Sequence, residues 1–107
     1  MQNSLNLAAR HLDLLLALLH QYVPQSEVWA FGSRVTGGSH ECSDLDLVLR
    51  NTADLKLATE GWSELKEALE QSSLPILVDV HDWAYLPASF HHEIARCYVV
   101  LKTAEKG

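Results

Sequence analysis

Apolar positions near the start of the chain repeat at the spacing of a helix. Between residues 3 and 22 they recur with the 3.6-residue period of one amphipathic face. The members of this face are Leu5, Ala8, Leu12, Leu15, Leu16, Leu19, Tyr22 and Val23. Because proline cannot continue a helix, we expect a helix over residues 3–22 that ends before Pro24.

The same segment carries a second apolar stripe, made of Leu7, Leu14 and Leu18. At 100° per residue this stripe lies more than about 100° from the first, so one buried face cannot include both. Its own domain could cover the helix on two sides. We favour the alternative, in which the stripe is exposed and joins the first helix to a second copy or to another protein.

Three later segments have the pattern of strands. Residues 27–31, EVWAF, form a short apolar run, and residues 44–50, DLDLVLR, alternate acids with leucines. A loop rich in glycine and serine joins them. Residues 75–83, PILVDVHDW, are rich in β-branched side chains and predict a third strand.

Two further helices complete the pattern. Residues 54–71 carry Leu55, Ala58, Trp62, Leu65 and Leu69 at helical spacing, interrupted by Gly61. Residues 88–102 predict a short helix that runs into an extended tail. Strands that alternate with helices predict an α/β (α+β) fold, with a small mixed β-sheet packed by helices. No repeat or linker divides residues 1–107, so we expect a single domain.

Composition narrows the possible functions. A chain of 107 residues has no room for a separate substrate-binding domain. Its net charge of -6, without a cluster of Lys and Arg, argues against extended nucleic-acid binding. The run LDLLLALL, residues 12–19, is too short for a membrane span. Two cysteines, Cys42 and Cys97, are too few for a disulfide framework, so we expect a cytoplasmic protein.

The strand over residues 44–50 carries the first candidate chemistry. Side chains alternate along a strand, so Asp44 and Asp46 should share one face, about 7 Å apart, while the leucines between them enter the core. Like charges at that distance repel unless a cation lies between them. A solvated edge strand with two unrelated acids is the alternative.

The turn after the first strand supplies a neighbouring phosphate site. Backbone amides after Gly32, at the start of a short helix, can bind phosphate oxygens, and the Ser33 hydroxyl adds a donor. Magnesium prefers carboxylates together with substrate phosphates. Gly38 stands where a P-loop has its lysine, which counts against a P-loop NTPase.

Together these motifs resemble a known family. Gly32-Ser33, ten intervening residues and Asp44-Leu45-Asp46 are similar to the signature of the DNA-polymerase-β-like nucleotidyltransferases. At this length the chain most resembles the minimal nucleotidyltransferases (MNT) of prokaryotes, encoded beside helical HEPN partners. The resemblance covers nearly the whole chain and implies the polymerase-β palm-like fold.

The resemblance also implies residue roles. Asp44, Asp46 and Asp79 match the catalytic, metal-binding acids, and Gly32 and Ser33 match the nucleotide-phosphate turn. Arg34 follows this turn, so it could reach the triphosphate or leaving pyrophosphate, and we give a surface ion pair equal weight.

Two choices depend on position along the chain. Asp79 is preferred to Asp82 as the third acid because it lies between two valines on the opposite face, whereas Asp82 suits a turn or cap. The six histidines, His91 and His92 among them, lack metal-site spacing, so we expect them at the surface.

The activity implied by the resemblance is transfer of a nucleoside monophosphate, most often AMP from ATP, to a hydroxyl group with the help of two Mg²⁺ ions. The acceptor would be a HEPN toxin, which makes the protein an antitoxin. Two alternatives stay open: a binding module that neutralises its partner without catalysis, and a stand-alone enzyme that modifies a small molecule.

Overall fold

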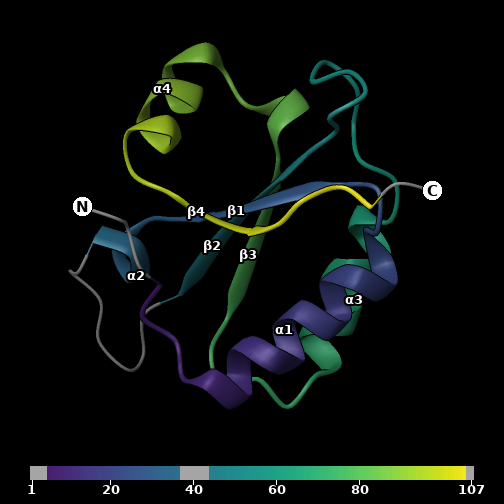
Figure 1. The fold of residues 1–107 in the computed structure, drawn as a ribbon, viewed down its shortest axis with the longest axis vertical. Coiled ribbons are helices and arrows are strands. Elements are labelled where there is room, and N and C mark those ends of the chain that lie inside the picture. The colour runs from purple at the N-terminus through teal and green to yellow at the C-terminus, as the bar shows by residue number, and fades with distance from the viewer. Residues whose placement is uncertain (1–4, 37–43, 106–107) are drawn as a thin grey trace.

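The computed structural model describes residues 5–36 and 44–105, which form a four-stranded mixed sheet flanked by helices (Figure 1). The elements in order are α1 (Ala9–Tyr22), β1 (Glu27–Phe31), α2 (Ser33–Thr36), β2 (Leu45–Arg50), α3 (Trp62–Gln71), β3 (Val78–Asp82), the 3₁₀ turn η1 (Trp83–Tyr85), α4 (Ala88–Arg96) and β4 (Val99–Lys102). The strand order is β3-β2-β1-β4. β1 runs antiparallel to β2 and β4, and β2 runs parallel to β3, which confirms the predicted mixed α/β sheet.

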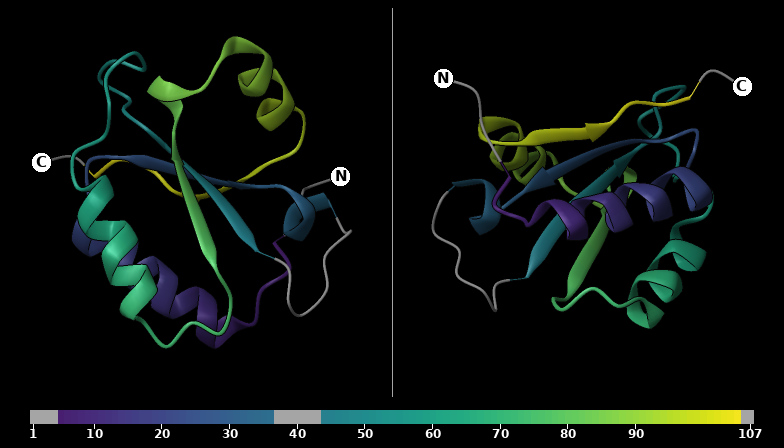
Figure 2. Two further views of the ribbon diagram at one scale, coloured as in Figure 1. Left: turned by 180° about the vertical axis from the view of Figure 1, so that it is seen from behind. Right: turned by 60° about the horizontal axis from the view of Figure 1, so that its bottom comes forward.

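Helices cover both faces of this sheet. α1 and α3 lie side by side against one face, and α4 lies on the opposite side, as the two views of Figure 2 show. Alternate strand residues separate into two cores because successive side chains point to opposite faces. The core under α1 and α3 includes Leu15, Leu19, Val28, Ala30, Leu45, Leu47, Leu49, Leu65 and Val80. The core under α4 is made of Trp29, Phe31, Val48 and Ile94.

The first helix is shorter than predicted. It begins at Ala9, and the residues before it are held by a backbone hydrogen bond in which Asn6 N donates to Arg34 O at 2.8 Å. The predicted C-terminal end is confirmed: the helix stops at Tyr22, and the Val23 amide closes it on Leu19 O. Tertiary contact with the turn after β1 therefore overrides the apolar period at residues 5–8.

The second apolar stripe on this helix is not an exposed patch, so that prediction was wrong. Leu7 and Leu18 pack against the core, and Leu14 is half-buried. The reason is that α1 contacts α3 while its Leu15 and Leu19 share a core with Val28 of β1, so two sides of it are covered within the domain.

The second long helix is also shorter than predicted. Residues 54–60 form turns, and α3 begins only after Gly61, whose φ of +90° interrupts a right-handed helix. Asn51 and Asp54 accept hydrogen bonds from backbone amides two residues further on, which stabilises turns instead of a helix. Leu57, an apolar residue in the predicted helix, is 55% exposed.

The C-terminal segment folds as predicted into a short helix, α4, and an extended tail, β4. The tail adds a strand to the sheet beside β1. The third predicted strand is present but shorter, over Val78–Asp82. Within the described part of the chain, no helix has the length and apolar character needed to cross a bilayer.

Candidate active site

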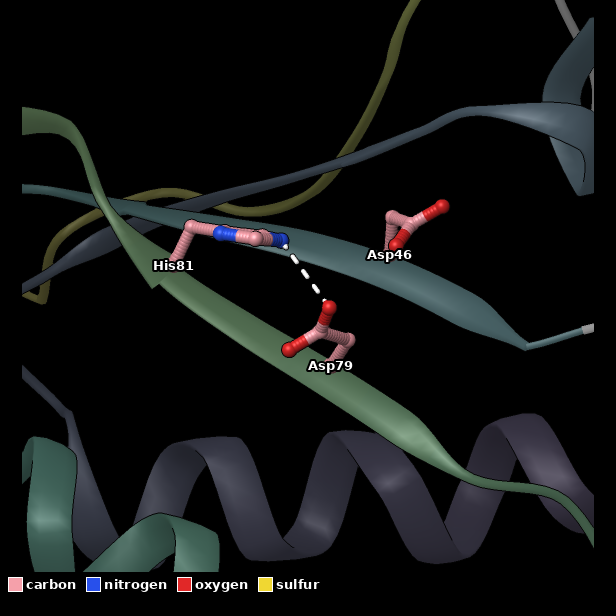
Figure 3. Close-up of side chains that lie close together, drawn as sticks. All are labelled: Asp46, Asp79 and His81. Atoms are coloured by element: carbon pink, nitrogen blue, oxygen red, sulfur yellow. Dashed lines mark ion pairs between the residues drawn. The ribbon is translucent and has the colours of Figure 1, made fainter. Parts of the chain in front are cut away.

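Asp46 and Asp79 lie beside one another on adjacent strands. They are register partners in the parallel pairing of β2 with β3, and Asp46 is also opposite Phe31 of β1. Side chains in register share a face, so both carboxylates stand on the face of the sheet away from α1 and α3 (Figure 3), which is the side on which α4 lies (Figure 1). The sequence predicted Asp46 and Asp79 as members of one site, and the fold brings them together.

His81 completes a cluster of three side chains. Asp46, Asp79 and His81 each offer one ligand atom, and these atoms all lie within 4.8 Å of one another. His81 Nε2 is 3.3 Å from Asp79 Oδ2, and in Figure 3 the tip of the imidazole ring points toward the two carboxylates. Two carboxylates and one imidazole form a donor set that suits a divalent cation.

Asp44 lies just outside this cluster. It is exposed and immediately precedes β2, which begins at Leu45. It is still close enough that its charge raises the pKa of Asp46. Two other carboxylates therefore act on Asp46: Asp44, just before β2, and Asp79 on the next strand.

The electrostatics of Asp46 test whether a cation fits. Burial raises the pKa of this carboxyl group most, the Asp79 charge raises it further, His81 lowers it, and Asp44 adds a smaller increase. Among the nearby charges, the effect of Asp79 exceeds that of His81 and Asp44 adds to it, so the positive charge does not balance the negative charge around Asp46. A divalent cation would supply that balance, so the residues present fit the metal that the sequence predicted.

Gly32 brings the turn after β1 against Asp46. Its φ is +85°, a backbone conformation that favours glycine, and a Cβ atom added there would collide with the Asp46 carboxylate. α2 starts at the next residue, Ser33, and Val35 N donates to Gly32 O at 3.0 Å. The predicted phosphate turn and the predicted acids are therefore in direct contact. That Gly32 and Ser33 bind phosphate stays a prediction.

Arg34 is not at the surface, so the surface ion pair considered for it does not describe its position. The residue is only 6% exposed, and its Nη1 donates to Asn6 O at 2.7 Å. This bond ties α2 to the segment that precedes α1. A contact of Arg34 with phosphate also stays a prediction.

Asp82 is a capping residue, as expected. The residue is 2% exposed, and its side chain accepts hydrogen bonds from Thr59 N at 2.7 Å and Ala84 N at 3.1 Å. One bond caps η1 and the other holds the loop before α3. Asp82 lies on the opposite face of β3 from Asp79, among the residues under α1 and α3.

The histidines were expected at the surface. His20 and His92 are exposed, whereas His11, His81 and His91 are half-buried, and His40 lies outside the described residues. His91 stacks on Trp83 with ring centroids 3.9 Å apart. The position of His81 on the face of Asp79 had a signal in the sequence: Asp79-Val80-His81 repeats the two-residue spacing of Asp44-Leu45-Asp46. The expectation for the histidines rested on helical metal motifs such as H-E-x-x-H, which a spacing along a strand does not match.

Comparison with known proteins decides the family. Residues 15–106 match the family described as "Polymerase beta, Nucleotidyltransferase". The chain belongs to this nucleotidyltransferase family. It is also 39% identical over 102 residues to the "Probable protein adenylyltransferase MntA" of Haemophilus influenzae, covering 95% of this chain and 88% of that protein. The nucleotidyltransferase is therefore a minimal, MntA-related member of the family, as its motifs predicted.

A solved structure shares the fold. The "Crystal structure of the toxin-antitoxin with AMP-PNP" superposes with a TM-score of 0.69 at 23% sequence identity, over 88% of this chain and 74% of the other. Together with the family match over residues 15–106, this similarity confirms the polymerase-β-like fold. Membership in the family makes this chain an enzyme that uses a nucleoside triphosphate and a divalent metal.

Proposed function

We propose that this nucleotidyltransferase transfers AMP from ATP to a hydroxyl group on a partner protein, a HEPN toxin, and so acts as a cytoplasmic antitoxin. The observation that carries the proposal is the contact of Gly32 with Asp46, which joins the phosphate turn to the acid cluster. The relationship to a probable protein adenylyltransferase and the fold shared with a toxin–antitoxin structure support the choice of a protein acceptor.

Asp44 and Asp46 would hold two Mg²⁺ ions, and Asp79, the register partner of Asp46 on β3, would contact one of them. When bound, the ions would supply positive charge to the attacking and leaving oxygens of an in-line displacement. Gly32 and Ser33 would bind the triphosphate through backbone amides and a hydroxyl group. Arg34, anchored on Asn6, holds this turn in place.

The reaction forms one bond and breaks one bond. The acceptor oxygen attacks the α-phosphorus of ATP, the bond from that phosphorus to the bridging oxygen of the β-phosphate breaks, and pyrophosphate leaves. Asp79 takes the proton of the acceptor hydroxyl. Its side chain is 57% exposed, so an acceptor group brought by another protein can reach it.

The size of the chain supports an acceptor that arrives as part of a partner. The described residues form one sheet with helices on its two faces, and they include no second lobe to hold a small acceptor. A protein acceptor needs no such lobe, because its own fold positions the hydroxyl group.

The test is transfer of labelled AMP. The protein is incubated with a helical HEPN protein, Mg²⁺ and ATP labelled at the α-phosphate, and label is expected on the HEPN protein; ATP labelled at the γ-phosphate should give none. The double variant Asp44→Asn, Asp46→Asn should lose transfer, while Asp54→Asn, which removes an exposed loop acid, should keep it. A partner that is neutralised without receiving label would overturn the proposal in favour of the non-catalytic binding module.

A further inference from the structure

His81 lies where a third ligand of a bound metal ion would lie. It follows Asp79 by two residues on β3, so the two side chains leave the same face of the strand. Its Nε2 faces Asp79 at 3.3 Å, and its ligand atom lies within 4.8 Å of a carboxylate oxygen of Asp46. The ring thus reaches over from β3 toward β2 (Figure 3).

Aromatic packing restricts the orientation of this ring. Its centroid is 5.7 Å from that of Phe31 on β1 and 6.1 Å from that of Phe90 on α4. The two phenylalanines also contact one another edge to face at 5.9 Å. The side chain of His81 is 29% exposed, so a rotation into solvent would give up these contacts. The imidazole is therefore held with its nitrogen toward the carboxylates.

The chemistry of the three donors differs from that of an all-carboxylate site. Carboxylates suit Mg²⁺ and Mn²⁺, whereas an imidazole nitrogen favours transition metals over Mg²⁺. We propose that His81 is a ligand of the same ion as Asp46 and Asp79, and that this nitrogen shifts the preference of the site from Mg²⁺ toward Mn²⁺. This inference rests on the proposed metal-dependent transfer, because it adds a ligand to the same site.

The contacts of His81 with Asp79 also allow a second arrangement, in which His81 does not bind the ion. His81 could donate a hydrogen bond to Asp79 and hold that carboxylate in place without touching the ion. In this arrangement the ion has only oxygen ligands, so nitrogen should leave no trace in the spectrum of the bound metal. The two arrangements are therefore separated by spectroscopy and not by activity, which both would lower on loss of the imidazole.

The experiment is pulsed electron paramagnetic resonance of Mn²⁺ bound at less than one equivalent to the whole chain. Inorganic tripolyphosphate replaces ATP, because it offers phosphate oxygens without nitrogen. The expected result is electron spin echo modulation from ¹⁴N that changes to the ¹⁵N pattern when the protein is made with ¹⁵N-labelled histidine. A spectrum without histidine nitrogen, or no bound Mn²⁺ with tripolyphosphate present, would overturn the proposal.

Variants assign the nitrogen to one residue. His81→Gln should abolish the modulation and weaken Mn²⁺ binding by at least about tenfold, the loss that follows removal of even an outer partner of a metal ligand. His92→Gln, which removes an exposed histidine on α4, should change neither. Modulation that persists in a folded His81→Gln protein would contradict the assignment. None of these results depends on AMP transfer, so loss of transfer alone would refute the proposed function and leave the ligand assignment standing.

Discussion

Asp46 of β2 and Asp79 of β3 are paired in register across a parallel strand pair, with the chain between them crossing over through α3. The two carboxylates are therefore placed by backbone hydrogen bonds of the sheet and not by loops. Rigid strands hold functional groups more accurately than loops do. The structure keeps these like charges together although they repel, which is the physical basis of the predictions that follow.

Removing the charge of Asp46 should stabilise the metal-free protein while it abolishes transfer. The folded-state pKa of Asp46 is raised above its ordinary value of 3.8, so protonation of this group favours the folded state. This contribution to stability is complete below pH 3.8 and is lost as pH rises through the folded pKa. At neutral pH the ionised group thus opposes folding. Asp46→Asn should raise the free energy of unfolding by up to about 1 kcal/mol, since water still screens a half-buried charge.

The measurement is urea unfolding in the presence of a chelator, at pH 7 and again at pH 3. The difference between Asp46→Asn and the unaltered protein should be present at pH 7 and shrink at pH 3, where the carboxyl group is protonated in both states. An equal difference at both pH values would contradict the electrostatic explanation. Asp54→Asn, in the exposed loop before α3, serves as the control for loss of one negative charge.

Divalent cations should offset the destabilisation that the ionised Asp46 causes. A cation between Asp46 and Asp79 offsets their repulsion and binds only the folded chain, so it should raise the melting temperature in proportion to the logarithm of its concentration. We expect the increase with Mg²⁺ and with Mn²⁺, and not with K⁺ at matched ionic strength. Differential scanning calorimetry of the unaltered protein and of Asp46→Asn checks this, because the variant should respond far less.

Gly32→Ala should damage the site and the fold together. Alanine at a φ of +85° costs about 1–2 kcal/mol, and its methyl group would also displace the Asp46 carboxylate. We therefore expect reduced stability together with loss of transfer under conditions in which the protein is still folded.

Gly61→Ala is a matched control for the glycine prediction. Its φ of +90° is close to that of Gly32. A Cβ atom there would meet the backbone carbonyl of Tyr22 and not a carboxylate of the site. This variant should lose stability and keep the transfer rate per folded molecule. Equal loss of transfer in both variants would show that the effect of Gly32→Ala is global unfolding. Circular dichroism and the labelled-AMP assay, run on the same samples, separate the two outcomes.

The alternation of acids and leucines in residues 44–50 was enough to place Asp46, because a period of two determines the face of a strand whichever strand pairs with it. The distance from Asp46 to His81 was not available in the same way. It depends on β3 pairing parallel with β2 in the register Asp46 to Asp79, a long-range choice that no local pattern encodes. The two-residue spacing of Asp79 and His81 indicates only that they share a face of β3, and it does not bring His81 beside Asp46.

The predicted starts of α1 and α3 were wrong for a related reason. The apolar spacing over residues 54–60 is helical, yet the Asx turns at Asn51 and Asp54 and the positive φ of Gly61 stabilise a loop there. At the N-terminus, the hydrogen bond of Asn6 with Arg34 draws the chain toward α2 before α1 begins. In both places a specific contact determines the path of the backbone. The spacing of apolar residues indicates only which face is buried.

The two acids of β3 should respond in opposite ways to substitution. Asp79→Asn should lose transfer by at least about a hundredfold, the effect expected of a general base, and keep the stability of the fold. Asp82→Ala should keep transfer and lose about 1–3 kcal/mol, because the amides of Thr59 and Ala84 would lose their acceptor. Chemical denaturation and the AMP-transfer assay of both variants check this, and exchanged phenotypes would assign the third acid to Asp82.

Lys102 should stabilise the attachment of the last strand. Its ammonium group donates to the backbone carbonyls of Ser26, Pro24 at 3.3 Å and Thr103 at 3.0 Å, and its side chain is buried. Burial lowers the pKa of this group, and Glu105 partly opposes that shift. Lys102→Met should keep the aliphatic packing but leave these carbonyls without their donor, at a cost of about 1–3 kcal/mol.

The sign of the pH dependence at Lys102 gives an independent check. A lowered folded pKa means that the unfolded chain binds more protons as the group titrates, so the protein gains stability as pH rises through the folded pKa toward the ordinary value of 10.5. Lys102→Met should lack this gain in urea unfolding measured between pH 8 and pH 10.5. Lys56→Met, at an exposed position before α3, should behave like the unaltered protein at every pH. If both variants lose the gain in stability with rising pH, the gain comes from general surface charge. If Lys102→Met alone loses it, the gain comes from the buried ammonium group that joins β4 to the turn before β1.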